Sequence, residues 1–465
     1  MKIFRLLLTL ALLCSIGTAY AKTKDTPQQD YRLDYVNINW WKQYNDDNLV
    51  NLMMKTYQNN QDLKIATIKS KQADQAVKEA FANELPYIGF NGSIGRDITS
   101  STTRFGDLVI PDYSQTRFLL PFMMTYEVDI WGENRLRTKS VEKQRDIIKQ
   151  NERASYINLT SEVASNYFNL IKLDKLIENQ EKLVEIQRKI AEMQDIKYKN
   201  GLCSTVEVLI EKQALTVFEE ELNDYKNKQD TIYNQLIVLL GERDANEIIR
   251  NSFDALSLPE IPESITADAI SQRPDLIKAE DYIKKIGYDV KVARRNFLPK
   301  FTIYGQAGFN AYNNFSHLFD SHTFLSNVGI MPSFDLFTGG AKLAHLRYNK
   351  LEYEKAGQIY EKVLLTSIQE LNDSLTTAKI SKKNYNKSLE RLGIEKEKFD
   401  LSQKKMDIGA KSNLDHLKAE ESVILSERAE ISNKINYLIS TINLYKAVGG
   451  VDYNNLKAET NEENI

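Results

Sequence analysis

The sequence has few of the residues that build metal sites, redox sites or disulfide frameworks. Its 465 residues include only two cysteines, Cys14 and Cys203, and four histidines. The histidines are scattered, and the chain contains no HExxH motif, no CxxC pair and no phosphate-binding loop. We therefore expect no catalysis, no cofactor and no metal site.

Long hydrophobic runs and a charge excess are also missing. After the N-terminus no run of about 18 apolar residues occurs, so a membrane-spanning helix is not expected. Transmembrane strands stay compatible with this composition, because they alternate apolar and polar residues. The formal net charge is -3, which gives no basic excess for a nucleic-acid partner.

Residues 1–21 are typical of a secretory signal peptide. Lys2 and Arg5 precede an apolar centre, and Ala19-Tyr20-Ala21 forms a small-x-small cleavage site. A lipoprotein site at Cys14 would require a small residue before the cysteine, but Leu13 stands there. The mature chain would keep Cys203 alone and form no internal disulfide.

An internal repeat organises the rest of the chain. Aligned without a gap, 62–95 and 275–308 share 12 of 34 residues, including Leu85-Pro86 and Leu298-Pro299. The repeat continues at slightly different offsets, since Gly201 corresponds to Gly409 and Gly241 to Gly449. One structural unit is therefore used twice, with length changes in loops.

Proline placement predicts where each unit is helical. None of the nine prolines lies in 133–257 or after 332, and both segments carry apolar residues three and four apart. Gly132 to Gly201 spans 69 residues (201 − 132), as does Gly340 to Gly409 (409 − 340). At about 1.5 Å per residue, each is a helical run on the order of 100 Å. Each then stops at glycine and restarts after a capping serine, which predicts two long antiparallel helical hairpins, 132–240 and 340–448.

The segments between the prolines and the hairpins have the pattern of strands, at about 86–98, 114–131, 299–312 and 323–337. Their residues alternate between an apolar and a polar face. Two interpretations compete: a soluble sheet on a core, or a membrane wall with lipid on one side and water on the other. The secretory signal and the long rods favour the wall. Because four strands cannot enclose a channel and open edges cannot face lipid, several copies would have to complete it. Three copies would give twelve strands, although the strand pattern alone does not choose three over four.

Several phrases carry a resemblance to a known family. They are "WWKQYNDDNLVNL" from Trp40, "YEVDIWG", "SQRPDL" from Ser271, "ARRNFLP" and "SFDLFTGG". In this order and with this duplication, the chain resembles the outer-membrane efflux proteins, the TolC-type exit ducts, in the branch paired with resistance–nodulation–division pumps. The resemblance implies a homotrimer with a twelve-stranded outer-membrane β-barrel, continued by a periplasmic α-helical barrel.

The resemblance also implies a domain plan. Beyond the signal peptide, 22–60, 242–274 and 449–465 would form an equatorial region, and 61–241 and 275–448 would be the two repeats. The expected function is passive conduction of drugs, other toxic compounds or secreted proteins from an inner-membrane pump to the exterior. The alternative is a soluble periplasmic coiled-coil adaptor or scaffold.

Candidate site residues follow from the resemblance and the repeat. Adaptor contact is expected at the hairpin tips, and a constriction near them; three acids are expected to face the lumen near the lower rim of the barrel. The tip residues are Gly201, Ser204, Gly409 and Ser412; the constriction residues are Asp415, Glu207 and Lys411; the lumen-facing acids are Glu127, Asp129 and Asp335. A Glu207–Lys411 pair would tie the hairpins together. The expected partners are a periplasmic adaptor, an inner-membrane pump (of the resistance–nodulation–division type, or an ABC exporter) and outer-membrane lipid.

Overall fold

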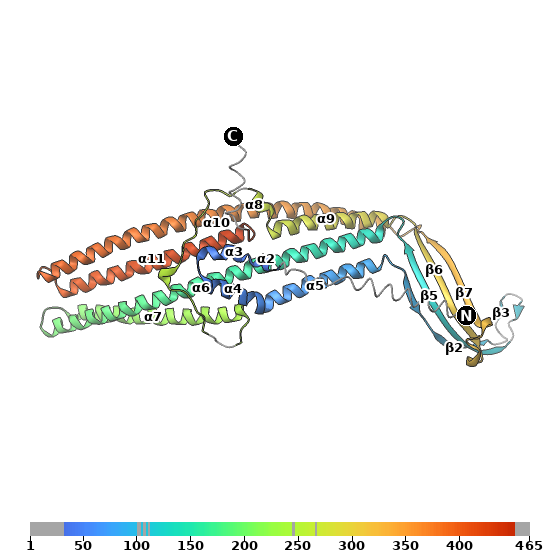
Figure 1. Cartoon of the computed structure of the whole chain (residues 1–465), viewed down its shortest axis with the longest axis horizontal. Coiled ribbons are helices and arrows are strands. Elements are labelled where there is room, and N and C mark those ends of the chain that lie inside the picture. The colour runs from blue at the N-terminus through green and yellow to red at the C-terminus, as the bar shows by residue number, and fades with distance from the viewer. Residues whose placement is uncertain are drawn as a thin grey trace, which may run out of the picture.

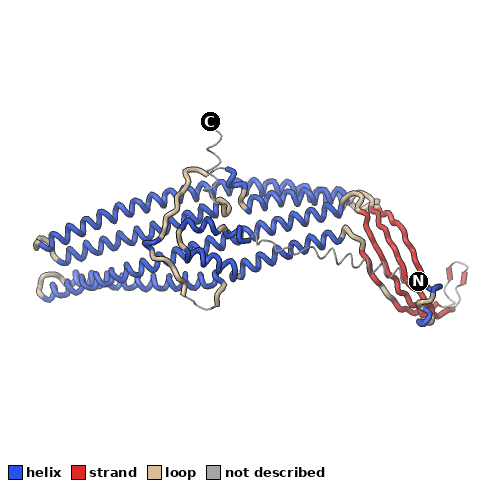
Figure 2. The backbone as a smooth tube through the Cα atoms, viewed as in Figure 1, coloured by secondary structure: helices blue, strands red, loops and turns tan. Residues whose placement is uncertain are grey.

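The computed structural model describes residues 32–99, 104–105, 108–109, 112–243, 247–265 and 267–451. The predicted signal peptide and most of the predicted C-terminal tail lie outside these residues. A layer of long helices makes up most of the molecule, and one antiparallel sheet continues it at one end (Figures 1 and 2). Among the described helices, none combines the length and the apolar character that crossing a membrane would require.

Two continuous helices, α6 (Glu133–Lys199) and α10 (Ala341–Asp407), run along the helical layer. Each has 67 residues and is therefore about 100 Å long. Each begins after a glycine in the left-handed region, Gly132 (φ 71°) or Gly340 (φ 83°). The absence of proline from both segments leaves their backbone hydrogen bonds uninterrupted.

Shorter helices lie beside the long ones. In the half next to the sheet, α5 (Gln61–Ala82) and α9 (Pro274–Arg295) flank α6, and α9 also packs on α10. In the other half, α7 (Thr205–Leu240) and α11 (Asn413–Ala447) flank α6, and α11 packs on α10. Figure 1 shows that α5 continues the line of α7, and α9 that of α11.

The two repeats join their short helices in the same way. Asn60, the N-cap of α5, donates from Nδ2 to the carbonyl oxygen of Leu239 at 2.8 Å. Arg273, the N-cap of α9, donates from Nη1 to the carbonyl oxygen of Ala447 at 2.7 Å. Asn60 and Arg273 occupy equivalent repeat positions, as do Leu239 and Ala447. In both stacks a side chain thus satisfies a carbonyl that the end of the preceding helix leaves without a helical partner.

The sheet has the order β1-β5-β6-β7, and β2 also pairs with β5. β1 and β2 pair with successive parts of β5 and so form one interrupted strand, which leaves four strand positions across the sheet. The strands are β1 (Tyr87–Phe90), β2 (Ser93–Thr99), β5 (Tyr113–Val128), β6 (Lys300–Tyr312) and β7 (Phe324–Ser333). All of these pairings are antiparallel. A small separate hairpin comprises β3 (Arg104–Phe105) and β4 (Leu108–Val109). β5 and β7 end three and four residues before the ends predicted from alternation, at 131 and 337.

The register collects most of the large apolar residues on one face of this sheet. Opposed residues point to the same side, so the pairs Ile88–Met124, Phe122–Ala307 and Phe309–Phe324 share a face. The residues on this face are Ile88, Phe90, Ile94, Phe118, Leu120, Phe122, Met124, Tyr126, Val128, Phe301, Ile303, Ala307, Phe309, Ala311, Phe324, Val328 and Ile330. The opposite face is mixed: it carries Arg117, Glu127, Thr302, Gln306, Asn310 and Asn327 together with Leu119, Met123, Leu325 and Met331.

The largest core lies midway along the helices, where the N-terminal segment packs against them. This segment comprises α2 (Arg32–Val36), α3 (Ile38–Trp41), η1 (Lys42–Tyr44) and α4 (Asp47–Asn59). Trp40 stacks on Tyr445 of α11 with ring centroids 3.9 Å apart, and Trp41 donates to the carbonyl of Val36. The inter-repeat linker, with η2 (Phe253–Ala255) and α8 (Ala267–Ser271), also reaches this core, where Phe253 accepts a hydrogen bond from buried Lys434.

The helix stacks make a testable prediction at Gly241. This residue has φ +68°, and an added Cβ would lie 2.5 Å from the carbonyl oxygen of Asn59. Gly241→Ala should lower the melting temperature of the purified protein, because an L-residue in the left-handed region costs about 1–2 kcal/mol before any clash. Gly393→Ala in α10 is the matched control, since a Cβ added there would have no atom within 4 Å apart from the backbone of its own helix. It should raise stability by about 0.5–1 kcal/mol. Equal melting-temperature shifts in the two variants would contradict the role assigned to Gly241.

Candidate functional site

The hairpin tips lie at the end of the helical layer that is farthest from the sheet (Figure 1). At the first tip, Gly201 adopts φ 71°, and the amides of Gly201 and Leu202 donate to the carbonyls of Tyr198 and Lys197, both at 2.9 Å. At the second tip, Gly409 and Ala410 donate in the same pattern to Met406 and Lys405. This pair of bonds is the Schellman ending, which requires glycine at the left-handed position. Both predicted tip glycines therefore have a defined role in the backbone.

Each tip then restarts its helix with a complete capping box. The backbone amide of Ser204 donates to Oε2 of Glu207 at 2.7 Å, and Ser204 Oγ accepts from the Glu207 amide. Ser412 and Asp415 repeat the arrangement, and Ser412 Oγ also donates to Asp415 Oδ2 at 2.8 Å. Both predicted constriction acids are thus the third helical residues of α7 and α11, and their carboxylates cap those helices. Hydrogen bonds from Ser412 hold the pKa of the Asp415 carboxyl below its ordinary value.

The structure does not join Glu207 to Lys411 within one chain. Lys411 Nζ lies 3.4 Å from Ser402 Oγ, while the Glu207 carboxylate is occupied by its cap. Another two ion pairs link the hairpins instead, Lys418–Glu211 at 3.3 Å and Arg428–Glu221 at 3.1 Å. Arg428 also donates to the hydroxyl of Tyr225 at 2.6 Å. No local pattern in the sequence marks these ties, because their partners are about 207 residues apart.

Apolar side chains are exposed at both tips. Leu202 is 75% exposed and Ile408 is 78% exposed, and each lies within one residue of its tip glycine. Val206 and Leu209 extend the first patch along α7. The sequence signal for these patches was the position of Leu202 and Ile408 in turns, because a turn in water rarely needs a large apolar residue.

The three acids predicted to face the lumen lie in two different places. Glu127 is on the polar face of β5, where Lys300 Nζ contacts it at 3.2 Å and Glu133 of α6 at 3.6 Å. Asp129 lies one residue beyond β5 and accepts hydrogen bonds from the amides of Asn134 and Arg135. Burial opposes ionisation of the Asp129 carboxyl, but these bonds and the Arg135 side chain lower its pKa overall.

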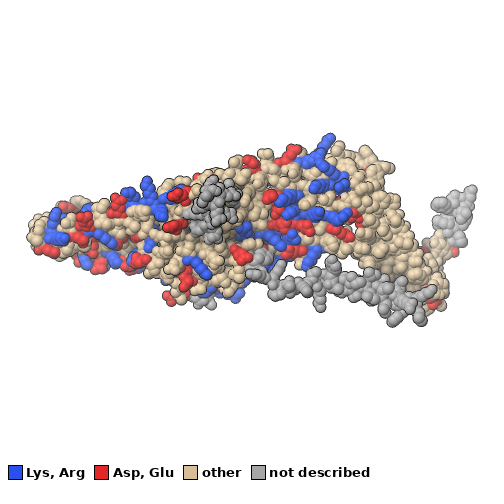
Figure 3. Space-filling model, turned by 45° about the horizontal axis from the view of Figure 1, so that its top comes forward, with Lys and Arg blue, Asp and Glu red and all other residues tan. Residues whose placement is uncertain are grey.

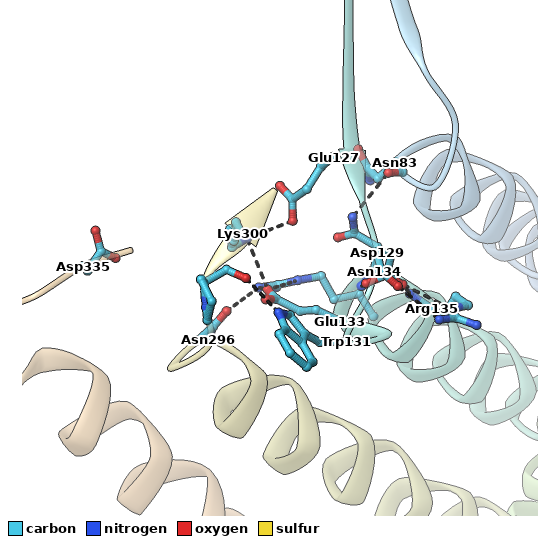
Figure 4. A network of polar contacts seen from close by, with 12 residues as sticks. Asn83, Glu127, Asp129, Trp131, Glu133, Asn134, Arg135, Asn296, Lys300 and Asp335 are labelled. Atoms are coloured by element: carbon cyan, nitrogen blue, oxygen red, sulfur yellow. Dashed lines mark hydrogen bonds and ion pairs between the residues drawn. The ribbon is translucent and has the colours of Figure 1, made fainter. Parts of the chain in front are cut away.

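Asp335 lies beyond β7, in the segment that leads to α10, and pairs with Lys342 at 2.9 Å. Figure 4 shows it apart from the cluster around Lys300. Asp129 and Asp335 therefore bind the starts of the two long helices. Trp131 links the same region across the repeats by donating to the carbonyl of Pro299 at 2.7 Å. Within the described residues, no group of three or more His, Cys, Asp or Glu side chains is arranged to hold a metal ion.

Comparison with solved structures identifies the fold. The Campylobacter jejuni CmeC outer membrane channel matches with a TM-score of 0.80 and 24% identity, covering 91% of each chain. The Vibrio cholerae outer membrane protein VceC matches with a TM-score of 0.77 and 23% identity, covering 89% of this chain and 98% of that one.

Curated relatives agree over nearly the full length. A probable efflux pump outer membrane protein of Pseudomonas putida, TtgC, is 24% identical over 93% of this chain and 88% of its own. The cation efflux system protein CusC of Escherichia coli O157:H7 is 23% identical over 94% of this chain and 95% of its own. The family model described as outer membrane efflux protein matches residues 52–242 and 266–450, one match for each repeat. The resemblance in the sequence is thereby confirmed, and the chain belongs to the outer membrane efflux protein family.

Proposed function

We propose that three copies of this chain form the exit duct of a tripartite efflux system. Their sheets would close a twelve-stranded barrel in the outer membrane, and their helices would continue it as a tube through the periplasm. The observation that carries the proposal is the sheet, which has one largely apolar face, a mixed face that carries its charged and amide side chains, and two open edges. Conduction would be passive, with the energy supplied by the pump.

The open edges support assembly from several copies. Among the described strands, β7 pairs only with β6, and β1 and β2 pair only with β5. Lipid offers no hydrogen-bond partners, so these edges would have to pair with neighbouring copies. A soluble scaffold, the alternative function, would leave the apolar face in water, where Val328 and Ile330 are already mostly exposed in the single chain.

The flanks of the helical layer support the same assembly. α10 lies at one edge of the layer, and few of its residues are buried. Large apolar side chains, including Leu351, Leu365 and Ile380, remain exposed along it. At the opposite edge, Ile65 and Ile68 of α5 and Ile210 of α7 are exposed as well. Burial of these two flanks against neighbouring copies would stabilise a closed tube by about 25 cal/mol per Å² of apolar surface.

The tips are proposed to contact the adaptor and to narrow the tube. Gly201, Ser204, Gly409 and Ser412 shape the two turns, and Leu202 and Ile408 supply apolar surface for a partner. Three copies of Asp415 would ring the narrow end and favour cations. Glu127, Asp129 and Asp335 would line the passage at the junction between barrel and tube.

The relatives share the duct but differ in the substrates that their names give. The relatives' names include antibiotic, toluene, pyoverdine and cation efflux or export. One architecture thus serves chemically different cargo, and we infer that the inner-membrane pump selects the substrate. A resistance–nodulation–division pump is the proposed partner, with an ABC exporter as the second candidate.

Single-channel recording in planar bilayers tests the duct and the acidic ring together. The purified chain should form cation-selective channels. Asp415→Ala should weaken the cation preference, because it removes the ring charge, and should raise conductance, because the smaller side chain widens the constriction. A protein that never conducts and is released from cells by osmotic shock would contradict the duct.

Ser412→Ala is the matched control for this experiment. It removes the capping hydroxyl, at a cost of about 1 kcal/mol in helix stability, while the carboxylate stays. It should therefore leave ion preference unchanged. If both variants shift ion preference equally, the cap rather than the ring charge controls the channel.

The inter-hairpin ties generate a separate prediction. Lys418→Gln combined with Arg428→Gln should increase the open probability, since surface pairs are worth about 0.2–1 kcal/mol each, these two are partly exposed, and every copy would lose both. In the otherwise wild-type chain, exchanging the charges of one pair (Glu211→Lys with Lys418→Glu) should keep the wild-type open probability, because the pair forms again with its charges reversed. An open probability that the double neutralisation leaves unchanged would exclude the ties from gating.

A further inference from the structure

A basic groove lies between α9 and α10 in the half of the helical layer next to the sheet. It has a volume of about 520 Å³, and its lining includes Lys284, Tyr288, Lys291, Arg294, Lys350 and Tyr353. Gly287 provides the space, since its backbone faces the ring of Tyr353. Figure 3 shows lysine and arginine side chains gathered over this part of the helices.

Of the four bases in the groove, only Lys284 has an anionic partner in the described part of the chain: it pairs with Glu280 at 2.8 Å. Lys291 lies over the ring of Tyr288, 5.3 Å from its centroid. Lys291, Arg294 and Lys350 are exposed, and none of them forms an ion pair with a described residue. The one acid that lines the groove is Glu354. An excess of cations beside two aromatic rings favours an anionic ligand that also has apolar parts.

The repeat indicates which face of the layer the groove opens on. Thr67 of α5 donates to Glu152 of α6, and Glu152 also binds Arg32 of α2. Thr67 therefore lies on the face that the N-terminal segment covers. Glu280 occupies the same position in the second repeat, and its partner Lys284 lines the groove. The groove therefore opens on the face that carries the N-terminal segment. In the proposed tube this is the outer face, because that segment would otherwise fill the lumen.

The groove also lies at the depth of a membrane surface. Lys291 is four residues before the end of α9 at Arg295, and so about 6 Å below it. The apolar face of the sheet begins just above, at Phe301. Exposed Trp131, Phe297, Phe334 and Phe337 lie in the connecting segments, at the level where aromatic residues mark a membrane interface. Lipid headgroups extend about 5–8 Å beyond the hydrocarbon, which long basic side chains can reach.

We propose that this groove binds the headgroup of an anionic phospholipid from the periplasmic leaflet, with Lys291, Arg294 and Lys350 contacting the phosphate. The tyrosines would pack against the glycerol and the upper acyl carbons. The groove lies within one chain, so a trimer would carry three such sites. The inference rests on the proposed placement of the sheet in the outer membrane.

Native mass spectrometry of the full-length protein, purified in a neutral detergent, tests this site. The protein is titrated with phosphatidylglycerol or with phosphatidylcholine of the same acyl chains, and the retained lipids are counted. The wild type should retain more phosphatidylglycerol. The variant Lys291→Gln, Arg294→Gln, Lys350→Gln should lose about fivefold or more of that retention, since each base near a lipid surface contributes substantially.

A matched variant, Lys362→Gln, Lys382→Gln, Lys383→Gln, removes equal charge from exposed positions of α10 outside the groove. It should retain the lipid as the wild type does. Equal losses in both variants, or no preference for phosphatidylglycerol, would overturn the site.

Displacement of the lipid by inorganic phosphate alone, or by soluble cell-wall fragments, would assign the groove to those anions instead. Bilayer conductance of the groove variant separates the two proposals, because a conducting channel without lipid preference rejects only the lipid site.

Discussion

The unpaired backbone at the two edges of the sheet is the constraint on which the architecture depends. Each chain supplies one sheet with a continuous apolar face, but its outer strands pair on one side only. In hydrocarbon, every unpaired backbone amide or carbonyl costs several kcal/mol. In the proposed duct, a single chain of this shape could not satisfy those groups, so the fold of one copy and the assembly of several would be a single problem.

The helical layer solves the corresponding problem in water. A single layer of helices cannot bury apolar side chains on all sides, so it has a core in the middle and, in the proposed tube, would have neighbours at the flanks. The N-terminal segment supplies the core around Trp40 and Tyr445. Two uninterrupted helices give the layer its length, and stacked shorter helices fill the rows beside them. Asn60 and Arg273 connect these stacks, so one duplicated side-chain contact keeps both rows continuous.

Much of this fold could be predicted from the sequence, because its signals are local and repeated. Proline-free stretches and the paired glycines predict the long helices, and alternation predicts strands close to those observed. The predicted ends of two strands lie too far along the chain, because Asp129 and Asp335 continue the alternation but bind the starts of α6 and α10 instead. Alternation continues in the sequence after the backbone has left the sheet, so it does not show where pairing stops.

The candidate site was less predictable. The pattern Ser-x-x-Glu at Ser204, and Ser-x-x-Asp at Ser412, does contain the signal for a capping box. The role of Glu207 and Asp415 as capping acids could therefore have been predicted. The ties between Lys418 and Glu211 and between Arg428 and Glu221 could not, because they depend on how α7 and α11 are placed around α6. Only the register of three helices decides which charges meet.

The central claim is that copies of this chain close one another's open edges. The most direct measurement is the number of chains in the purified assembly, obtained by native mass spectrometry in a lipid nanodisc. The expected result is a single species that contains three chains, which places twelve strands in one wall. A monomer that stays folded and embedded in the lipid would contradict the claim.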